Sequence, residues 1–312
     1  MRRTNAIIFK QPNAIDISAT ALKPVEAGEV LIEVEASGIS TGTERLLFSG
    51  EMPPFPGMGY PLVPGYEAVG RVVASEAETG PTIGTRVFVP GSHGFTDAHG
   101  LFGAQAGHLV ARSDKLVPMP DGLGIETTLF ALAATAHRAV MRGSALPDLI
   151  VGHGVLGRLA ARIAAAKGKA PTVWEANPRR RSGARGYDIV DPLEDNRCDY
   201  APILDVSGDS SIIDSLVARS AKGGEIVLAG FYKQPLAFTF PPAFMRETSI
   251  RIAAEWSRAD MDAVVGMAAS GTLSLSGLVT HTARPADAAE AYRTAFEDAD
   301  CLKMIIEWER GA

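Results

Sequence analysis

Apolar and polar positions alternate over short segments in the first part of the chain. The segments with this strand-like pattern are 6–9, 30–35, 65–73, 84–90 and 107–111. Loops rich in proline and glycine separate them. Alternation with a period of two is typical of strands that bury one face. The pattern therefore predicts that a domain of small antiparallel strands comes first.

The pattern changes after residue 121. Residues 126–141 carry a long Ala-rich apolar face at helical spacing, and short apolar runs then alternate with helical segments. We expect strands at 149–151, 171–175, 203–207, 225–229 and 250–254, and helices at 211–220 and 259–270. Alternating strands and helices predict a parallel sheet that is covered on both faces.

The last part of the chain returns to strand character. We expect a strand at 277–281, a helix at 287–296 and a strand at 303–307 that rejoin the first domain. The predicted domains are 1–120 together with 272–312, and 121–271. A length of 312 residues suits two domains, and 46% hydrophobic residues supply two cores.

Charge and cysteine content exclude several classes of protein. The net charge is −6 and the charges are dispersed, so no basic face for nucleic acid is expected. Longer apolar runs are broken by Arg, His or Gly, so we expect no transmembrane segment and a cytoplasmic protein. Only Cys198 and Cys301 are present, far apart, which encodes neither a disulfide framework nor a structural zinc lobe.

Three glycines form a GxGxxG pattern between the apolar run at 149–151 and an amphipathic helix. Gly152 permits a tight turn, Gly154 lets the backbone approach a pyrophosphate, and Gly157 lets the helix lie close to the sheet. The helix carries Arg158 and Arg162 on a different face from its leucines, and its positive end points at the phosphates. This pattern predicts a dinucleotide site.

Glu175 strengthens that prediction, because it ends the next apolar run about 20 residues further on, where such folds bind the adenosine ribose. A carboxylate accepts from both ribose hydroxyls and repels a 2′-phosphate, which favours NAD; Arg179 and Arg180 argue the other way. His153 is expected beside the phosphates. The predicted NAD contacts are Gly152, His153, Gly154, Val155, Leu156, Gly157, Glu175 and Arg180.

The order of a β domain, a GxGxxG sheet and a returning tail resembles the medium-chain dehydrogenase/reductase family, which contains zinc alcohol dehydrogenases and quinone reductases. The resemblance spans the chain and rests on 38–40, 64–67 with Gly70 and Val72, 134–136, 205–208, 223–230 and 280–281. It implies an α/β fold with a GroES-like β-barrel domain and a Rossmann doubly wound parallel sheet. It also implies a homodimer, and cofactor contacts at Ser207, Gly208, Gly230 and Phe231.

Within that family, five stretches are similar to the branch that acts on magnesium tetrapyrroles in bacteriochlorophyll synthesis: 37–47, 61–67, 132–137, 240–246 and 292–296. This similarity implies NAD-dependent oxidation of a 1-hydroxyethyl side chain on a bacteriochlorophyllide to an acetyl group. Two alternatives stay open. One is a zinc-free NAD(P)H quinone or enone reductase, and the other is a non-catalytic protein that binds NAD and pigment.

The chain departs from the zinc members of the family at all three ligand positions. Ser40, Tyr66 and Ala131 stand there, and none is a usual zinc ligand, so no metal is expected. An alcohol does not ionise at neutral pH, so a side chain must handle its proton. Tyr66 is the first candidate and Glu67 the second, with Ser40 and Thr43 as relays. A packed strand residue with a satisfied hydroxyl is the alternative for Tyr66.

A planar macrocycle needs a wide apolar slot. The candidate walls are Phe48, Met52, Phe55, Met58 and Tyr60 on one side, and Phe231, Tyr232 and Phe244 on the other. These residues are also compatible with ordinary core and lid positions. His93, in a glycine-rich loop, is either a magnesium ligand, a pocket wall or a plain surface residue. His137 is expected to be a satisfied core histidine.

Overall fold

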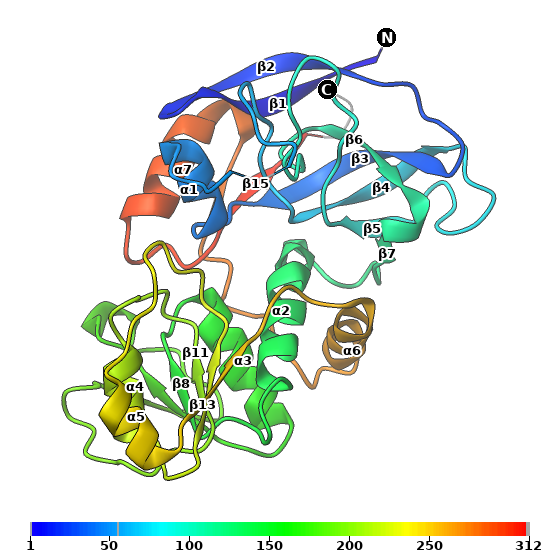
Figure 1. Cartoon of the computed structure of the whole chain (residues 1–312). Coiled ribbons are helices and arrows are strands. Elements are labelled where there is room, and N and C mark those ends of the chain that lie inside the picture. Colours follow the sequence, from blue (N-terminus) through cyan, green and yellow to red (C-terminus); the bar gives the residue numbers. More distant parts are fainter. Residues whose placement is uncertain (1, 55, 310–312) are drawn as a thin grey trace. The chain divides into compact units, whose positions relative to one another are not determined.

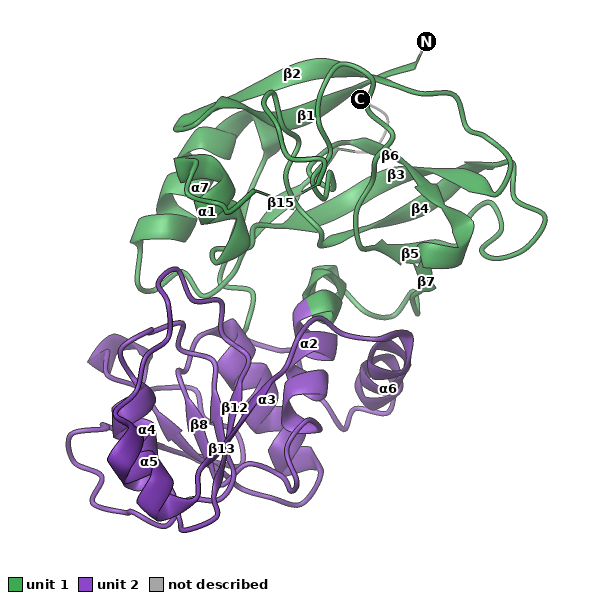
Figure 2. Ribbon diagram, viewed as in Figure 1, with its two compact units in different colours: residues 1–131, 278–312 green, residues 132–277 purple. Residues whose placement is uncertain are grey.

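The computed structural model describes residues 2–54 and 56–309. These residues form two compact units (Figure 2): unit 1 comprises residues 1–131 and 278–312, and unit 2 comprises residues 132–277. Unit 1 extends beyond the expected boundary at residue 120. Arg86 explains this, because its guanidinium donates to the carbonyls of Leu123 and Gly124 and to the hydroxyl of Thr127, and so ties this segment to unit 1.

Unit 1 is built mainly from antiparallel strands (Figure 1). Strands β1 (Arg2–Gln11) and β2 (Ala14–Leu22) pair with each other. The main sheet has the order β14-β15-β3-β4-β5-β7, with β6 on β3. Its strands are β3 (Glu29–Gly38), β4 (Ala68–Ser75), β5 (Arg86–Val89), β6 (His108–Arg112), β7 (Val117–Pro118), β14 (His281–Ala283) and β15 (Met304–Glu307).

The returning tail completes unit 1. Strand β15 pairs antiparallel with β3, the strand that the sequence pattern predicted at 30–35. Helix α7 (Ala288–Glu297) brings Tyr292 onto Phe9 of β1, with ring centroids 5.4 Å apart in an edge-to-face arrangement. Helix α1 (Thr43–Ser49) was not expected from the pattern, since its seven residues are too few for a clear helical period. Short 3₁₀ turns lie at Ser113–Lys115, Ile125–Leu129 and Pro285–Asp287.

Unit 2 holds a six-stranded sheet in which every neighbouring pair is parallel. Its order is β10-β9-β8-β11-β12-β13. The strands are β8 (Leu149–Val151), β9 (Thr172–Trp174), β10 (Asp188–Val190), β11 (Ile203–Asp205), β12 (Glu225–Leu228) and β13 (Ser249–Ile252). Taken in chain order, this is the 3-2-1-4-5-6 arrangement of dinucleotide-binding folds. The predicted α/β fold class is confirmed.

Helices flank this sheet (Figure 1). They are α2 (Phe130–Val140), α3 (Val155–Ala166), α4 (Ile213–Arg219), α5 (Phe240–Arg246) and α6 (Arg258–Ala269), with a 3₁₀ turn at Pro178–Arg180. Helix α5 begins with prolines in its first turn, where the missing N–H costs nothing. His137 of α2 contacts Asp260 of α6 at 2.9 Å, which fits the expected satisfied histidine.

Helix α3 carries two buried arginines, Arg158 and Arg162, which the sequence pattern alone did not indicate. Arg158 donates to the carbonyls of His153 and Arg180, and Arg162 donates to two carbonyls of the segment before residue 277. A helical pattern shows which residues share a face but not whether another segment covers that face.

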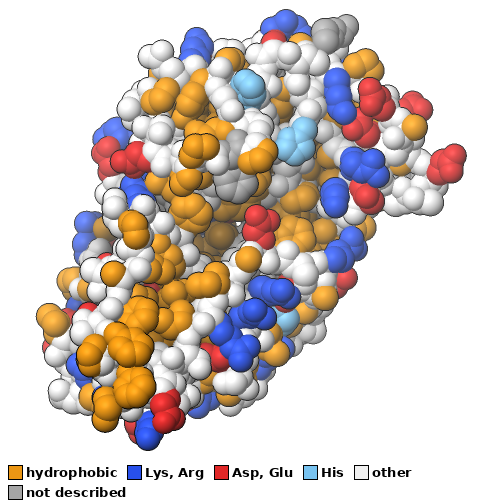
Figure 3. Space-filling model, viewed as in Figure 1, with side chains coloured by type: hydrophobic (Ala, Val, Ile, Leu, Met, Phe, Trp, Pro, Cys, Tyr) orange, Lys and Arg blue, Asp and Glu red, His pale blue; other side chains and the backbone are white. Residues whose placement is uncertain are grey.

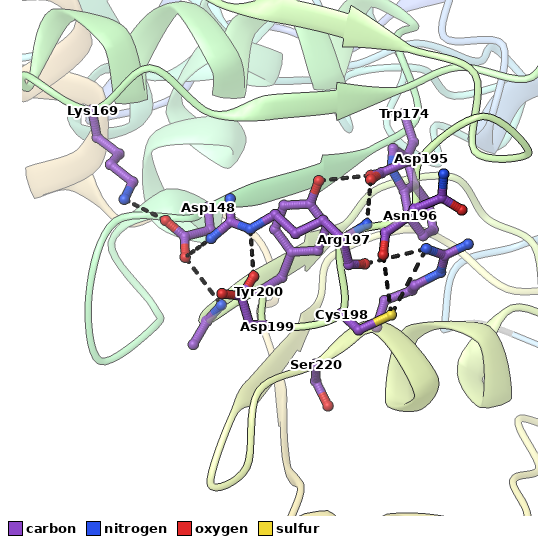
Figure 4. A network of polar contacts seen from close by, with 12 residues as sticks. Asp148, Lys169, Trp174, Asp195, Asn196, Arg197, Cys198, Asp199, Tyr200 and Ser220 are labelled. Carbon is purple, nitrogen blue, oxygen red and sulfur yellow. Dashed lines mark hydrogen bonds and ion pairs between the residues drawn. The ribbon is translucent and has the colours of Figure 1, made fainter.

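A polar network braces the sheet at the loop that leads into β11 (Figure 4). Asp148, just before β8, accepts from the backbone N–H of Ala201 at 3.2 Å and from Arg197 at 3.3 Å. Asp195 accepts from the indole of Trp174 and the hydroxyl of Tyr200, each at 2.6 Å. The network therefore ties the connection before β11 to strands β8 and β9.

Candidate functional site

The turn after β8 needs glycine at two of its three positions. Gly152 has φ +100°, a conformation that side chains disfavour, and a β-carbon there would lie 3.2 Å from the Cα of Ser207. A β-carbon on Gly157 would overlap the carbonyl oxygen of Gly152. Strand β8 can therefore turn into α3 only because these positions carry no side chain.

The start of α3 offers donors to a ligand. Gly154 is the N-cap residue, no side chain caps it, and a β-carbon built on it would meet nothing within 4 Å. The first backbone N–H groups of a helix lack partners inside the helix and favour anions. The turn from Gly152 through Val155, Leu156 and Gly157 therefore fits a pyrophosphate, which sequence reasoning predicted.

Loops after β11 and β12 lie against this turn. Ser207 and Gly208 follow β11, and a β-carbon on Gly230, after β12, would lie 2.9 Å from the backbone nitrogen of Gly208. The carbonyl of Phe231 is the nearest atom to a β-carbon on Gly208, at 3.1 Å. The structure thus brings together five predicted cofactor residues at the carboxyl ends of β8, β11 and β12, the usual ligand crevice of such sheets.

A buried carboxylate and a half-buried tyrosine hold these loops; from the sequence, Tyr232 was named only as a slot wall and Asp205 only within the stretch that carries the resemblance. Asp205, at the end of β11, accepts from the hydroxyl of Tyr232 at 2.6 Å and from the backbone N–H of Ser207 at 2.9 Å. Burial raises the pKa of Asp205. Its position at the end of an apolar strand was the available signal.

Glu175 lies at the end of β9 with its carboxylate fixed. One oxygen accepts from the backbone N–H of His153 at 3.0 Å, and the other accepts from the N–H of Asn177 at 2.8 Å. These bonds place the carboxylate next to the glycine turn. Each oxygen keeps a further lone pair that can accept from a ribose hydroxyl.

The ring of His153 does not point into the site. It is fully buried, and its nitrogens contact the carbonyl of Arg180 at 2.7 Å and the hydroxyl of Tyr187 at 2.8 Å. Burial lowers the pKa of His153 to about 4, so the ring is neutral near pH 7. The backbone N–H of His153 is donated to Glu175, so neither the ring nor the backbone N–H of His153 is directed at a phosphate here, and Arg180 contributes its carbonyl to the same cluster.

The residues expected to handle the proton cluster in unit 1. Ser40 follows β3, Thr43 begins α1, and Tyr66 precedes β4. The hydroxyls of Ser40 and Tyr66 are 2.5 Å apart. Tyr66 is half-buried, and its ring packs edge-on against Phe102 with centroids 5.3 Å apart. Burial and the charge of Glu67 raise the pKa of Tyr66 while hydrogen bonds from Ser40 and Thr43 oppose this, so Tyr66 holds its proton near pH 7.

Glu67 forms a fully buried ion pair with Lys303. Burial raises the pKa of Glu67, and Lys303 opposes this shift. A β-carbon on Gly38 would lie 2.9 Å from Cε of Lys303, so glycine at position 38 makes room for the pair. Sequence reasoning missed Lys303, which lies next to the last strand of the returning tail. A lone lysine in the apolar run at 303–307 was the available signal.

The candidate slot walls belong to different units, one to unit 1 and the other to unit 2. Phe55 lies outside the described residues. On the same wall, Met52 is in the hydrophobic core of unit 1, and Phe48, Met58 and Tyr60 pack against it. On the other wall, Phe231 and Phe244 are exposed. His93 is exposed in its loop, as is expected for a plain surface residue or a ligand-facing one.

Comparison with known proteins identifies the family. Residues 26–121 match the alcohol dehydrogenase GroES-like domain. The chain is 54% identical to the 2-desacetyl-2-hydroxyethyl bacteriochlorophyllide A dehydrogenase of Cereibacter sphaeroides over 99% of this chain and 100% of that protein. The protein of the same name from Rhodobacter capsulatus is 52% identical over 98% of each chain. The chain belongs to this dehydrogenase family.

Membership in the bacteriochlorophyllide dehydrogenase family confirms the predicted resemblance to medium-chain dehydrogenases. A solved alcohol dehydrogenase from E. coli CFT073, complexed with NADH, shares the fold with a TM-score of 0.82 at 19% identity, over 98% of this chain and 99% of that chain. NADP is bound in another solved structure of this fold. These likenesses show the shared fold, and the bound cofactors are those of the two solved proteins.

The zinc-ligand positions of the larger family carry other chemistry here. Ser40 and Tyr66 share a hydrogen bond, and Ala131 is a buried methyl group on α2. Among residues 2–54 and 56–309, no group of three or more His, Cys, Asp or Glu side chains is arranged to hold a metal ion. A search of the same residues found no helix long and apolar enough to cross a membrane.

Proposed function

We propose that this chain is an NAD-dependent dehydrogenase that oxidises the 3-(1-hydroxyethyl) group of a bacteriochlorophyllide to a 3-acetyl group in bacteriochlorophyll a synthesis. The observation that carries the proposal is the 54% identity, over the full length, to a dehydrogenase named for this substrate. The substrate is a magnesium tetrapyrrole, and its magnesium is part of the substrate rather than of the protein.

The reaction removes two electrons and two hydrogens from the carbinol. The carbinol C–H electron pair leaves as hydride to the nicotinamide when that cofactor is bound, and the hydroxyl proton goes to the protein. Because Tyr66 keeps its own proton, it does not act as a free phenolate. The Tyr66 and Ser40 hydroxyls, 2.5 Å apart, instead form a relay: one oxygen accepts the carbinol proton while its own O–H proton passes to the other oxygen, whose original proton leaves to solvent, so both hydroxyls end neutral.

The residues around this pair support a metal-free mechanism. The Thr43 side chain lies near enough to Tyr66 to lower its pKa. Glu67 is held in an ion pair with Lys303, so its carboxylate is not free to act as a base, and its negative charge raises the pKa of Tyr66. We therefore assign Glu67 a supporting role, and Ser40, Thr43 and Tyr66 the contact with the alcohol oxygen.

NAD is favoured over NADP by the geometry at Glu175. Its carboxylate is held by two backbone N–H groups and cannot swing away from a 2′-phosphate without losing them. Arg181 is already engaged, since it donates to the carbonyls of Glu175 and Ala176 and pairs with Asp191. This arrangement supports recognition of two ribose hydroxyls.

We also propose that the chain forms a homodimer through β13, and that it works in the cytoplasm. Strand β13 is an edge of the parallel sheet, and unpaired strand edges invite pairing. Its Ile252 is 62% exposed, and Phe244 and Met245 of α5 are 64% and 70% exposed. Figure 3 shows apolar side chains gathered on the lower part of the molecule. Sedimentation should give a dimer that Ile252→Glu converts to monomer and that Ile83→Glu, at a 66% exposed loop position, leaves intact.

Purified protein, NAD and a 3-hydroxyethyl bacteriochlorophyllide test the function directly. Absorption should show NADH forming together with the acetyl pigment, and metal analysis should find no zinc bound to the active protein. Turnover of quinones or enones with NADPH, without oxidation of the pigment, would favour the reductase alternative. Binding of NAD and pigment without any nicotinamide absorbance change would favour the non-catalytic one.

A further inference from the structure

A buried carboxyl lies behind the hydroxyl pair. Glu44 of α1 has no exposed surface, and its Oε1 accepts the backbone N–H of Ser40 at 2.9 Å. Its Oε2 accepts the hydroxyl of Tyr292, which comes from α7 in the returning tail. Both carboxyl oxygens are therefore occupied, one by the residue that contacts Tyr66 and one by a helix from the far end of the sequence.

These contacts fix the position of Ser40. The backbone of Ser40 leaves β3, and its N–H is bound by Glu44 while its hydroxyl meets Tyr66. Tyr292 is itself immobilised, because its ring packs edge-to-face on Phe9 and Phe296, with centroids 5.4 and 5.6 Å away. A chain of contacts therefore runs from the core of unit 1 through Tyr292, Glu44 and Ser40 to Tyr66.

Resting on the proposed function, we propose that Glu44 and Tyr292 are positioning residues that hold Ser40 against Tyr66, so that the hydroxyl pair is preorganised for proton transfer. Neither residue contacts the alcohol in this assignment. Their effect on catalysis passes through the place and orientation of Ser40. A loss of this alignment lowers turnover without changing cofactor affinity, since the cofactor residues lie in unit 2.

The charge around Glu44 adds a pH dependence. The ionisable groups that face it are Tyr292 from α7, Glu67 and Tyr66 ahead of β4, and Lys303 ahead of β15. Lys303 forms its ion pair with Glu67, and its charge lowers the pKa of Glu44 less than burial raises it. Burial raises the pKa of Glu44 to about 7, against hydrogen bonds from Tyr292 and Ser40. As the pH falls through 7, the Glu44 carboxylate becomes a neutral carboxylic acid. The Ser40 N–H then donates to a weaker acceptor.

A double-mutant cycle separates positioning from a general structural role. Glu44→Ala and Tyr292→Phe should each lower kcat about 10-fold or more, with the Kd for NAD unchanged. In a Ser40→Ala background, the same substitutions should cost little further, because their effect passes through the Ser40 hydroxyl. Glu44→Gln should recover most of the activity lost in Glu44→Ala, since its amide oxygen still accepts the Ser40 N–H. Glu290→Gln, on the exposed face of α7, is the matched control.

A second readout needs no substrate. In the apoprotein, the Ser40 amide proton should shift with pH around 7 by NMR, and this titration should vanish in Glu44→Gln while the amide stays protected from exchange. The proposal is overturned if each double variant loses kcat by the product of the two single-variant losses, because the residues then act independently of Ser40. Wild-type kcat in both Glu44→Ala and Tyr292→Phe would overturn it as well. If the wild-type protein fails to oxidise the hydroxyethyl pigment, the proposed substrate is wrong, and the cycle can be run on any alcohol that the enzyme oxidises.

Discussion

Gly157 lies against the backbone of Gly152 so closely that a β-carbon on Gly157 would be 2.8 Å from the carbonyl carbon of Gly152 and would overlap its oxygen. Both atoms belong to backbone that joins β8 to α3, and neither can move without shifting a helix or a strand. The two glycines therefore set the distance between the sheet and the cofactor-binding helix.

Gly157→Ala should push α3 away from β8 and weaken NAD binding. The added methyl group meets backbone rather than a flexible side chain, so the clash is relieved only by displacement of the turn. We expect the Kd for NAD to rise at least about 10-fold, and the free energy of unfolding to fall by about 1–3 kcal/mol. Calorimetric titration and thermal melting measure both. Gly266→Ala on α6, where a β-carbon meets nothing within 4 Å, is the control.

Tyr66→Phe should lower kcat about 10²-fold, the size expected for loss of a general acid–base group, while the Kd for NAD stays as in the wild type. Phenylalanine keeps the edge-to-face packing on Phe102, so the melting temperature should change little. Steady-state kinetics and NAD titration check this. Full activity in this variant removes Tyr66 from the mechanism and favours a packed residue with a satisfied hydroxyl.

Glu175→Gln should relax the preference for NAD. The amide keeps an oxygen for one backbone N–H but loses the charge that repels a 2′-phosphate. We expect the ratio of kcat/KM for NAD to that for NADP to fall about 10-fold or more. Glu194→Gln, an exposed residue of the same unit, should leave the ratio unchanged. A wild-type enzyme that uses both cofactors equally would contradict the assignment.

Asp195→Ala should destabilise unit 2. The change leaves the indole of Trp174 and the hydroxyl of Tyr200 without their shared acceptor, and we expect a loss of about 2 kcal/mol in the free energy of unfolding. Burial opposes ionisation, but the hydrogen bonds from Tyr200, the Arg197 backbone and Trp174 hold the pKa of Asp195 below its usual value. The stabilisation is therefore present above the unfolded-state pKa and lost as the pH falls through the folded one. Denaturant melts at two pH values test this, with exposed Asp199→Ala as control.

The raised pKa of Glu44 predicts the opposite pH dependence. The folded state keeps a proton up to about pH 7 that the unfolded chain releases near pH 4.5. The unfolded state then binds fewer protons in this range, so the contribution of Glu44 to stability falls as the pH rises from 4.5 to 7. Glu44→Gln removes this pH-dependent contribution to stability, because glutamine does not titrate. The melting temperature of Glu44→Gln relative to wild type should therefore rise over that range, and a constant difference would show that Glu44 does not titrate there.

The amino-acid sequence by itself determined the order of the elements and the cofactor turn. The patterns behind both are local in the sequence and can be recognised without knowing the fold. They are the period-two alternation, the alternating strand and helix segments, and the spacing of Gly152, Gly154, Gly157 and Glu175. The positions of Ser40 and Tyr66 followed from the resemblance, residue by residue. In the helix that follows the glycine turn, α3, the sequence pattern did not show that Arg158 and Arg162 are buried.

Only the tertiary structure decided which distant residues surround those positions. Lys303 reaches Glu67, and Tyr292 reaches Glu44, across more than 200 residues of sequence. No periodicity records such a pairing, because it depends on where the returning tail places β15 and α7 against β3 and β1. A buried charge is stabilised by a partner that is close in space, whatever the distance in sequence. The charged groups that surround the Ser40 and Tyr66 hydroxyls therefore come together only when unit 1 folds.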